Sequence, residues 1–175
     1  MIDPSSYLTE ETAKGGLPVT IRALRPDDRE RMATAVRGLD AESIYLRLFS
    51  RGRELTDAAI DRIMRFDRDR EIVLVATTES DTRIIGSGRY VLTHPGAAEV
   101  AFMVEEDFRG RGIAGTLLRH LARVATAQGI ETFEADVLAQ NRSMQSVFAR
   151  TGWGVQSRRE GDTVHLTMAL PRDGQ

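Results

Sequence analysis

The chain has no cysteine among its 175 residues. This absence excludes disulfides, a thiol nucleophile and thiolate metal sites, and the three histidines have no metal-ligand spacing. With 24 basic and 26 acidic residues, no overall basic field favours nucleic acid. No apolar run reaches membrane-spanning length, and no signal-peptide pattern opens the chain. These absences predict a cytoplasmic globular protein that binds no metal, nucleic acid or membrane.

The length of the chain suits one domain with a hydrophobic core and little more. Residues 1–16 contain Pro4, two serines and the Gly15-Gly16 pair, so we expect a flexible N-terminal segment there. We expect the following residues to form a single domain over 17–171, with a short C-terminal tail at 172–175.

Apolar spacing predicts helices and strands in an order typical of a mixed fold. The predicted helices cover 25–39, 40–49, 55–66, 113–128 and 141–151, and the predicted strands cover 17–24, 71–78, 82–92, 99–105, 131–138, 152–160 and 162–170. The three strands between 71 and 105 are separated by short turns and predict an antiparallel meander. The sequence therefore predicts the α/β (α+β) class, with a mixed, mostly antiparallel sheet of about six to seven strands flanked by helices.

The stretch "EEDFRGRGIAGTLL", residues 105–118, joins the last strand of the meander to the longest predicted helix. The first turn of a helix exposes backbone N–H groups, which attract an anion together with the helix dipole. Glycines let a phosphate approach the backbone closely, and Arg109 and Arg111 can add charge-assisted hydrogen bonds. The stretch predicts a site for a phosphate-bearing ligand, and the alternative is a tight strand-to-helix turn.

Two nucleotide-binding motifs match this stretch incompletely. The P-loop pattern fits Gly110, Gly115 and Thr116 but lacks its lysine. The dinucleotide pattern G-x-G-x-x-G fits Gly110, Gly112 and Gly115, but that motif usually opens a parallel α/β unit, whereas an antiparallel meander precedes it here. Nucleotide hydrolysis and dinucleotide binding are therefore disfavoured.

A third pattern, [Q/R]-x-x-G-x-[G/A], is satisfied from Arg109 to Ala114, between a strand and a helix. In this motif, in the order of the elements and in "NRSMQSVFARTGW", most of residues 17–170 resembles the GNAT superfamily of N-acetyltransferases. The resemblance implies acetyl-CoA as co-substrate, with its pyrophosphate on the loop amides and its pantetheine arm between strands 99–105 and 131–138. The coenzyme contacts that it implies are Phe102, Met103, Val104, Arg109, Gly110, Arg111, Gly112, Ile113, Ala114, Gly115, Thr116, Asn141 and Arg150.

Glu99 is the candidate catalytic residue. Acetyl transfer to an amine needs a base near the thioester, because a lysine amine is protonated at neutral pH. Glu99 begins the strand beside the expected pantetheine arm, where a glutamate is disfavoured without a reason. The resemblance implies a general base, and the alternative is a solvated strand-end glutamate. A backbone N–H near Met103 or Val104 would polarise the thioester carbonyl, and direct transfer in a ternary complex is expected because the chain has no cysteine.

The chain departs from many relatives at the residue that protonates the leaving thiolate. Many relatives carry a tyrosine in the helix after the asparagine, and here Phe148 stands where that hydroxyl is expected. The thiolate therefore leaves unassisted or receives a proton from water. Tyr45 and Tyr90 are substitutes whose positions the sequence does not give.

The segment "DAESIYLRLFS", residues 40–50, bears on the acceptor. It resembles bacterial protein-lysine acetyltransferases, which modify an active-site lysine of acyl-CoA synthetases, and so it implies a protein lysine as acceptor. Ser43, Tyr45 and Arg47 would then contact the substrate, or they serve ordinary helix packing. A small-molecule amine acetyltransferase and a non-catalytic acyl-CoA sensor stay open as alternatives.

Overall fold

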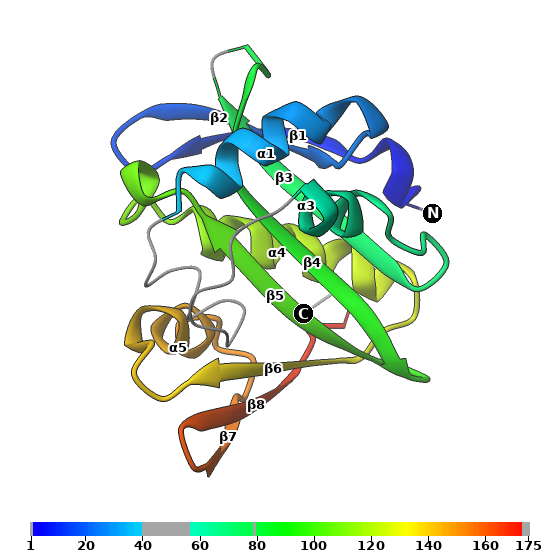
Figure 1. Ribbon diagram of the computed structural model, residues 1–175. Coiled ribbons are helices and arrows are strands. Elements are labelled where there is room, and N and C mark those ends of the chain that lie inside the picture. The colour runs from blue at the N-terminus through cyan, green and yellow to red at the C-terminus, as the bar shows by residue number, and fades with distance from the viewer. Residues whose placement is uncertain (1, 40–56, 79, 173–175) are drawn as a thin grey trace.

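One eight-stranded sheet organises the computed structural model, which describes residues 2–39, 57–78 and 80–172 (Figure 1). The strand order is β1-β2-β3-β4-β5-β6-β8-β7, and every neighbouring pair is antiparallel except β5 and β6. The predicted class is confirmed, with more strands than the six to seven expected. The strands are β1 (Leu8–Ala13), β2 (Leu17–Ala23), β3 (Glu71–Thr78), β4 (Arg83–His94), β5 (Ala97–Val104), β6 (Thr132–Leu138), β7 (Gln156–Glu160) and β8 (Thr163–Ala169).

The additional strand is β1, which lies within the segment expected to be flexible. Its residues pair with β2 from Leu8 opposite Arg22 to Ala13 opposite Leu17. The two glycines that suggested a loose segment, at positions 15 and 16, have φ values of +87° and +82° and form the tight turn of a hairpin. The expectation of a flexible segment over 1–16 is therefore wrong for residues 8–13. The reason is that "LTEETA" is a mostly polar edge strand, which lacks the apolar alternation that identifies strands.

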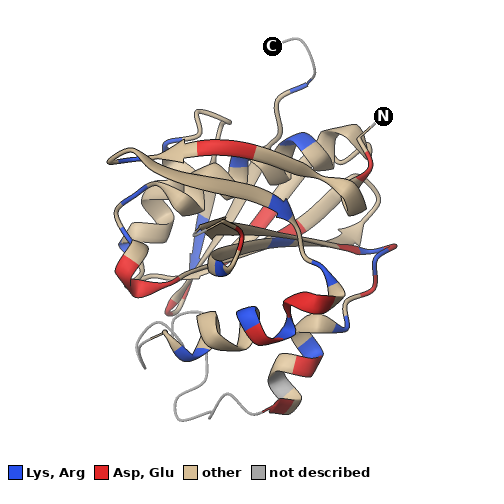
Figure 2. Ribbon diagram, turned by 90° about the horizontal axis from the view of Figure 1, so that it is seen from above, with Lys and Arg blue, Asp and Glu red and all other residues tan. Residues whose placement is uncertain are grey.

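Helices cover both faces of the sheet, which is seen together with its helices from above in Figure 2. The long helix α4 (Ile113–Ala127) buries Leu117, Leu118 and Leu121 in the larger core cluster, which Phe148 of α5 (Arg142–Ala149) also joins. On the opposite face, α1 (Arg29–Arg37) packs Met32 against β3 and β4 in a second cluster, and α3 (Asp57–Met64) lies beside α1. The expected helices at 25–39, 55–66, 113–128 and 141–151 each correspond to one of these, and the one expected at 40–49 lies outside the described residues.

The sheet ends differently from the prediction at its last hairpin. The strand predicted over 152–160 begins only at Gln156, because Gly152 and Gly154 have φ values of +72° and +66° that a strand does not accommodate. Within the described parts of the chain, no helix is both long and apolar enough to cross a membrane.

A buried histidine ties the hairpin of β1 and β2 to α4. His120 is 2% exposed; its Nε2 lies 2.7 Å from Glu11 Oε1 and its Nδ1 contacts the hydroxyl of Tyr7. A neutral imidazole satisfies both contacts, donating from Nε2 and accepting at Nδ1. Burial lowers the pKa of His120 and outweighs the opposing hydrogen bond and charge of Glu11.

We expect the free energy of unfolding to fall as the pH drops from 7 through the ordinary histidine pKa of about 6.5. The unfolded chain then takes up a proton at His120 that the folded chain refuses, and this favours unfolding until the folded pKa is reached. Urea unfolding between pH 5 and 8 measures the slope, which should be shallower in His120→Gln than in the control His94→Gln at an exposed site. Equal slopes in both variants would contradict the assignment.

Candidate functional site

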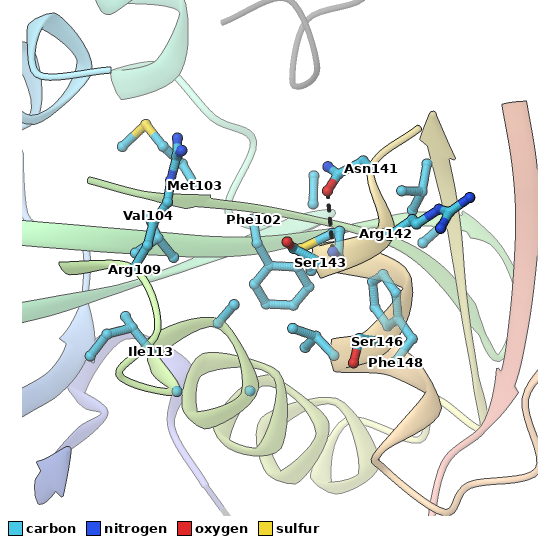
Figure 3. A pocket seen from close by; sticks show the side chains of 18 of the residues that line it. Phe102, Met103, Val104, Arg109, Ile113, Asn141, Arg142, Ser143, Ser146 and Phe148 are labelled. Atoms are coloured by element: carbon cyan, nitrogen blue, oxygen red, sulfur yellow. Dashed lines mark hydrogen bonds between the residues drawn. The ribbon is translucent and has the colours of Figure 1, made fainter. Parts of the chain in front are cut away.

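The candidate site is a cleft of about 750 Å³ that opens where β5 and β6 separate. The parallel pairing of these strands covers only Ala97–Glu99 with Thr132–Glu134. Beyond it, residues 100–104 form one wall of the cleft and residues 135–137 the other. The loop before α4 and the first turn of α4 close one side, and α5 contributes Ser143 and Ser146 to another (Figure 3).

The wall formed by β5 presents backbone polar groups to the cleft. Glu105 donates its N–H to Ile85 O on β4 at 2.8 Å, so the peptide groups of every second residue before it also face β4. The N–H and C=O groups of Val100, Phe102 and Val104 consequently point the other way, toward the cleft. An extended ligand with amide groups can pair with them as a strand would. Of the two donors expected for the thioester carbonyl, this parity favours the N–H of Val104 over that of Met103.

The loop before α4 has the geometry of an anion site. Gly110 and Gly112 adopt φ values of +77° and +76°, which other residues rarely adopt. A Cβ added at Gly110, Gly112 or Gly115 would meet no atom within 4 Å, so open space lies directly over the backbone. The N–H groups of Ile113, Ala114 and Gly115 have no partner within the helix, because they form its first turn. The cradle therefore suits a diphosphate.

The structure brings most of the predicted coenzyme residues to this cleft. Arg111 and Thr116 lie beside it. The guanidinium of Arg111 faces the turn of the β1–β2 hairpin, 3.4 Å from an ideal Cβ on Gly15, and the N–H of Thr116 already bonds Gly112 O at 3.0 Å. The predicted residues that line the cleft are Phe102, Met103, Val104, Arg109, Gly110, Gly112, Ile113, Ala114, Gly115, Asn141 and Arg150.

Asn141 has a structural task besides any contact with a ligand. Its Oδ1 accepts the N–H of Met144 at 3.2 Å and so caps α5 (Figure 3). Its side-chain NH₂ group is what the residue can offer to the cleft.

Several lining residues were not predicted from the sequence. Lys14 was hidden in the segment read as flexible, and Asp136 in a strand treated only as a wall. The polar residues at the start of α5 directly follow its N-cap, Asn141, so their place beside this predicted contact was the signal that could have identified them. Of the lining residues, the additional polar ones are Lys14, Asp136, Gln140, Arg142, Ser143 and Ser146.

Glu99 lies at the end of the paired part of β5, one residue before the cleft wall begins. Its side chain is exposed and shares a sheet face with Met103, which packs in the cluster below α1. Its register partner on β6 is Glu134. Two residues further along β6, Asp136 Oδ1 lies 2.7 Å from Nδ1 of His165 on β8. The face of the sheet next to the cleft is thus polar at this point.

Among the described residues that line the cleft, no tyrosine takes the place of the missing hydroxyl. Phe148 is 1% exposed and packs edge-on against Phe102, with ring centroids 6.0 Å apart. Tyr90 is buried against Phe133, and burial raises its pKa to about 12, while Tyr45 lies outside the described residues. The hydroxyls of Ser143 and Ser146 are the ones that α5 brings to the cleft.

Within residues 2–39, 57–78 and 80–172, no group of three or more histidine, aspartate and glutamate side chains could hold a metal ion.

Comparison with known proteins gives consistent matches. The sequence profile of the acetyltransferase (GNAT) family matches residues 39–153. The chain is 30% identical over 146 residues to acetyltransferase PA5475 of Pseudomonas aeruginosa, which covers 82% of this chain and 78% of that protein. It is 32% identical over 134 residues to acetyltransferase Pat of Mycolicibacterium smegmatis, which covers 75% of this chain and 40% of Pat. The solved GNAT domain of S. lividans PAT matches with a TM-score of 0.84 and 31% identity, over 93% of this chain and 97% of that domain.

Proposed function

The chain belongs to the acetyltransferase (GNAT) family, and we propose that it transfers the acetyl group of acetyl-CoA to a protein lysine, with Glu99 as general base. Membership of this family supports acetyl transfer as the reaction class and acetyl-CoA as the co-substrate. The observation that supports the site is the open space over the backbone of Gly110, Gly112 and Gly115. This loop adjoins the β5 wall, whose peptide groups at every second residue point into the cleft.

In this proposal, different residues of the cleft bind different parts of the coenzyme. The N–H groups at the start of α4 and the side chain of Arg109 hold the diphosphate. The backbone of Val100, Phe102 and Val104 pairs with the amides of the pantetheine arm, whose other side faces β6. The NH₂ group of Asn141 and the guanidinium of Arg150 add contacts from α5 and the residue after it.

The chemistry requires one proton acceptor and one carbonyl donor. Glu99 takes a proton from the ammonium or amine of the acceptor, directly or through water, so that the nitrogen lone pair can attack the thioester carbon. The N–H of Val104 stabilises the negative charge that develops on the carbonyl oxygen. The C–N bond forms and the C–S bond breaks. The nitrogen loses its remaining extra proton to water, and the coenzyme leaves as a thiolate that takes up a proton from water. The acetyl group passes directly to the acceptor because the chain has no cysteine to carry it.

The acceptor is proposed on similarity to Pat of M. smegmatis and to the GNAT domain of S. lividans PAT. The chain spans 40% of that Pat, so the targets and regulation of the longer protein do not transfer with the domain. A small-molecule amine is the second candidate, because the acceptor face beside Glu99 is exposed and polar and suits a free amine as well.

The decisive experiment incubates the chain and acetyl-CoA with an acyl-CoA synthetase, and in parallel with a panel of small amines. A colorimetric thiol assay measures the release of coenzyme A, and mass spectrometry detects acetylation of the acceptor. We expect one added acetyl group on a synthetase lysine. Thiol release with an acetylated amine and an unmodified synthetase would transfer the proposal to small amines. If acetyl-CoA binds but no coenzyme thiol is released in the presence of any of these acceptors, the chain would instead be an acyl-CoA sensor.

A substitution at Gly115 should affect the stability of the protein and its affinity for acetyl-CoA in opposite directions. It lies in the first turn of α4 without a positive φ and with open space where a Cβ would be. We expect Gly115→Ala to stabilise the free protein by about 0.5 kcal/mol, because alanine favours the helix, and to weaken acetyl-CoA binding severalfold, because its methyl group enters the cradle. Urea unfolding and calorimetric titration measure the two effects. The control Arg123→Ala, on an exposed position of the same helix, should leave the binding unchanged.

A further inference from the structure

We infer that Lys14, at the turn between β1 and β2, binds a phosphate of the coenzyme, so that the N-terminal hairpin forms an outer wall of the nucleotide end of the cleft. The inference rests on the proposed use of acetyl-CoA. Lys14 lines the same cleft as Gly110 and Gly112, although 95 or more residues separate it from them in the sequence. It is also the single lysine of the chain, whose other 23 basic residues are arginines.

The turn that carries Lys14 is fastened to the glycine loop. The backbone N–H of Lys14 donates to Arg111 O at 3.2 Å. On the next residue, an ideal Cβ of Gly15 would lie 3.4 Å from the guanidinium of Arg111, and the φ of Gly15 is +87°. Backbone and guanidinium of Arg111 thus both face this turn, which explains why its side chain is beside the cleft instead of on its wall.

The hairpin as a whole is also anchored to α4, whose N-terminus forms the cradle. His120 contacts Glu11 at 2.7 Å and the hydroxyl of Tyr7, and both residues belong to or adjoin β1. The hairpin and the first turn of α4 therefore keep a fixed relative position. Lys14 loses only side-chain freedom when it binds an anion, which lowers the cost of the contact.

Most of the described charged residues that line the cleft are basic. Among the described residues that line it, the basic ones are Lys14, Arg109, Arg142 and Arg150, and the single acidic one, Asp136, is paired with His165. No described acidic group forms an ion pair with the ammonium of Lys14, which is exposed. Because the whole chain carries a net charge of −2, this local excess of positive charge is a property of the cleft. A multiply charged phosphate ligand complements it.

Coenzyme A carries a diphosphate and a 3′-phosphate, and either can be the partner of Lys14. The two are separated by comparing coenzyme A with 3′-dephospho-coenzyme A, which lacks only the second group. The single lysine makes the measurement direct, since an amine-reactive acetylating reagent has one side-chain target besides the N-terminal amine.

The first test measures the rate at which the reagent modifies Lys14, with and without coenzyme A. Modification removes the tryptic cleavage after Lys14, so peptide mass spectrometry reads it, and the N-terminal amine serves as internal control. We expect coenzyme A to slow the modification of Lys14 at least about fivefold, since an ammonium held by a phosphate is seldom free to react. Protection that is lost with 3′-dephospho-coenzyme A assigns the 3′-phosphate, and retained protection assigns the diphosphate. Equal rates with and without coenzyme A overturn the inference.

The second test separates charge from mere proximity by calorimetric titration of coenzyme A. We expect Lys14→Gln to raise the Kd about threefold to fivefold at low salt, with the difference disappearing at high salt, as for exposed ion pairs. Lys14→Arg should stay within about twofold of the wild type, and so should Arg123→Gln, which removes an exposed cation outside the cleft. Unchanged binding in Lys14→Gln defeats the inference while leaving the proposed function intact. A wild-type chain that binds no coenzyme A defeats the proposed function itself.

Discussion

Replacing Glu99 by glutamine should lower kcat about 100-fold to 10,000-fold, the range that general-base catalysis contributes. The amide cannot accept the proton of the acceptor amine, whereas its shape keeps β5 intact. Binding of acetyl-CoA should change less than about twofold, because Glu99 lies outside the cleft lining. Steady-state kinetics and calorimetric titration measure the two quantities.

The pH dependence distinguishes a base from a residue that only shapes the site. The deficit of Glu99→Gln should shrink as the pH rises toward the amine pKa of about 10.4, since the acceptor then loses its proton without help. Glu134→Gln is the matched control, because it removes the neighbouring carboxylate on the same sheet face. A comparable loss in both variants, or a deficit in Glu99→Gln that is constant with pH, would argue against the base.

The part of the site that could be predicted from the sequence is the part made by backbone. The positive φ values of this loop favour glycine, as at Gly110 and Gly112, whatever surrounds them, and a strand followed by a helix places the loop at a helix N-terminus. The helix face of α4 followed equally from local periodicity, because its leucines pack against a single sheet surface.

Features made by long-range contacts could not be predicted in this way. The hairpin of β1 and β2 is linked to α4 by the contact of Glu11 with His120, which are 109 positions apart in the sequence, and no local pattern records such a contact. The same applies to Lys14, which enters the cleft only because the hairpin folds over the glycine loop. The separation of β5 and β6, which opens the cleft, is a property of the sheet that neither strand shows alone.

Helix α1 is held by a buried ion pair that the sequence also did not reveal. Arg22 of β2 is 1% exposed and Asp28, directly before α1, is not exposed at all. Nη1 and Nη2 of Arg22 donate to the Asp28 carboxylate at 2.7 and 2.8 Å. Arg22 also donates to Asp81 at 2.7 Å. Burial opposes ionisation of Asp28, but its hydrogen bonds from Arg22 and the backbone of Arg25 outweigh that cost and lower its pKa.

Asp28→Ala should therefore destabilise the fold by about 3 kcal/mol or more, because it leaves the buried Arg22 without its bidentate partner. Urea unfolding at pH 7 measures the loss. The control is Asp61→Ala, which breaks the half-exposed pair of Arg29 and Asp61 and should cost clearly less, because solvent screens that pair. The double variant Arg22→Met with Asp28→Leu should recover part of the loss, since it removes the uncompensated charge together with the pair. Equal costs for Asp28→Ala and Asp61→Ala would mean that Asp81 alone satisfies Arg22, and that the anchoring of α1 lies in its apolar contacts.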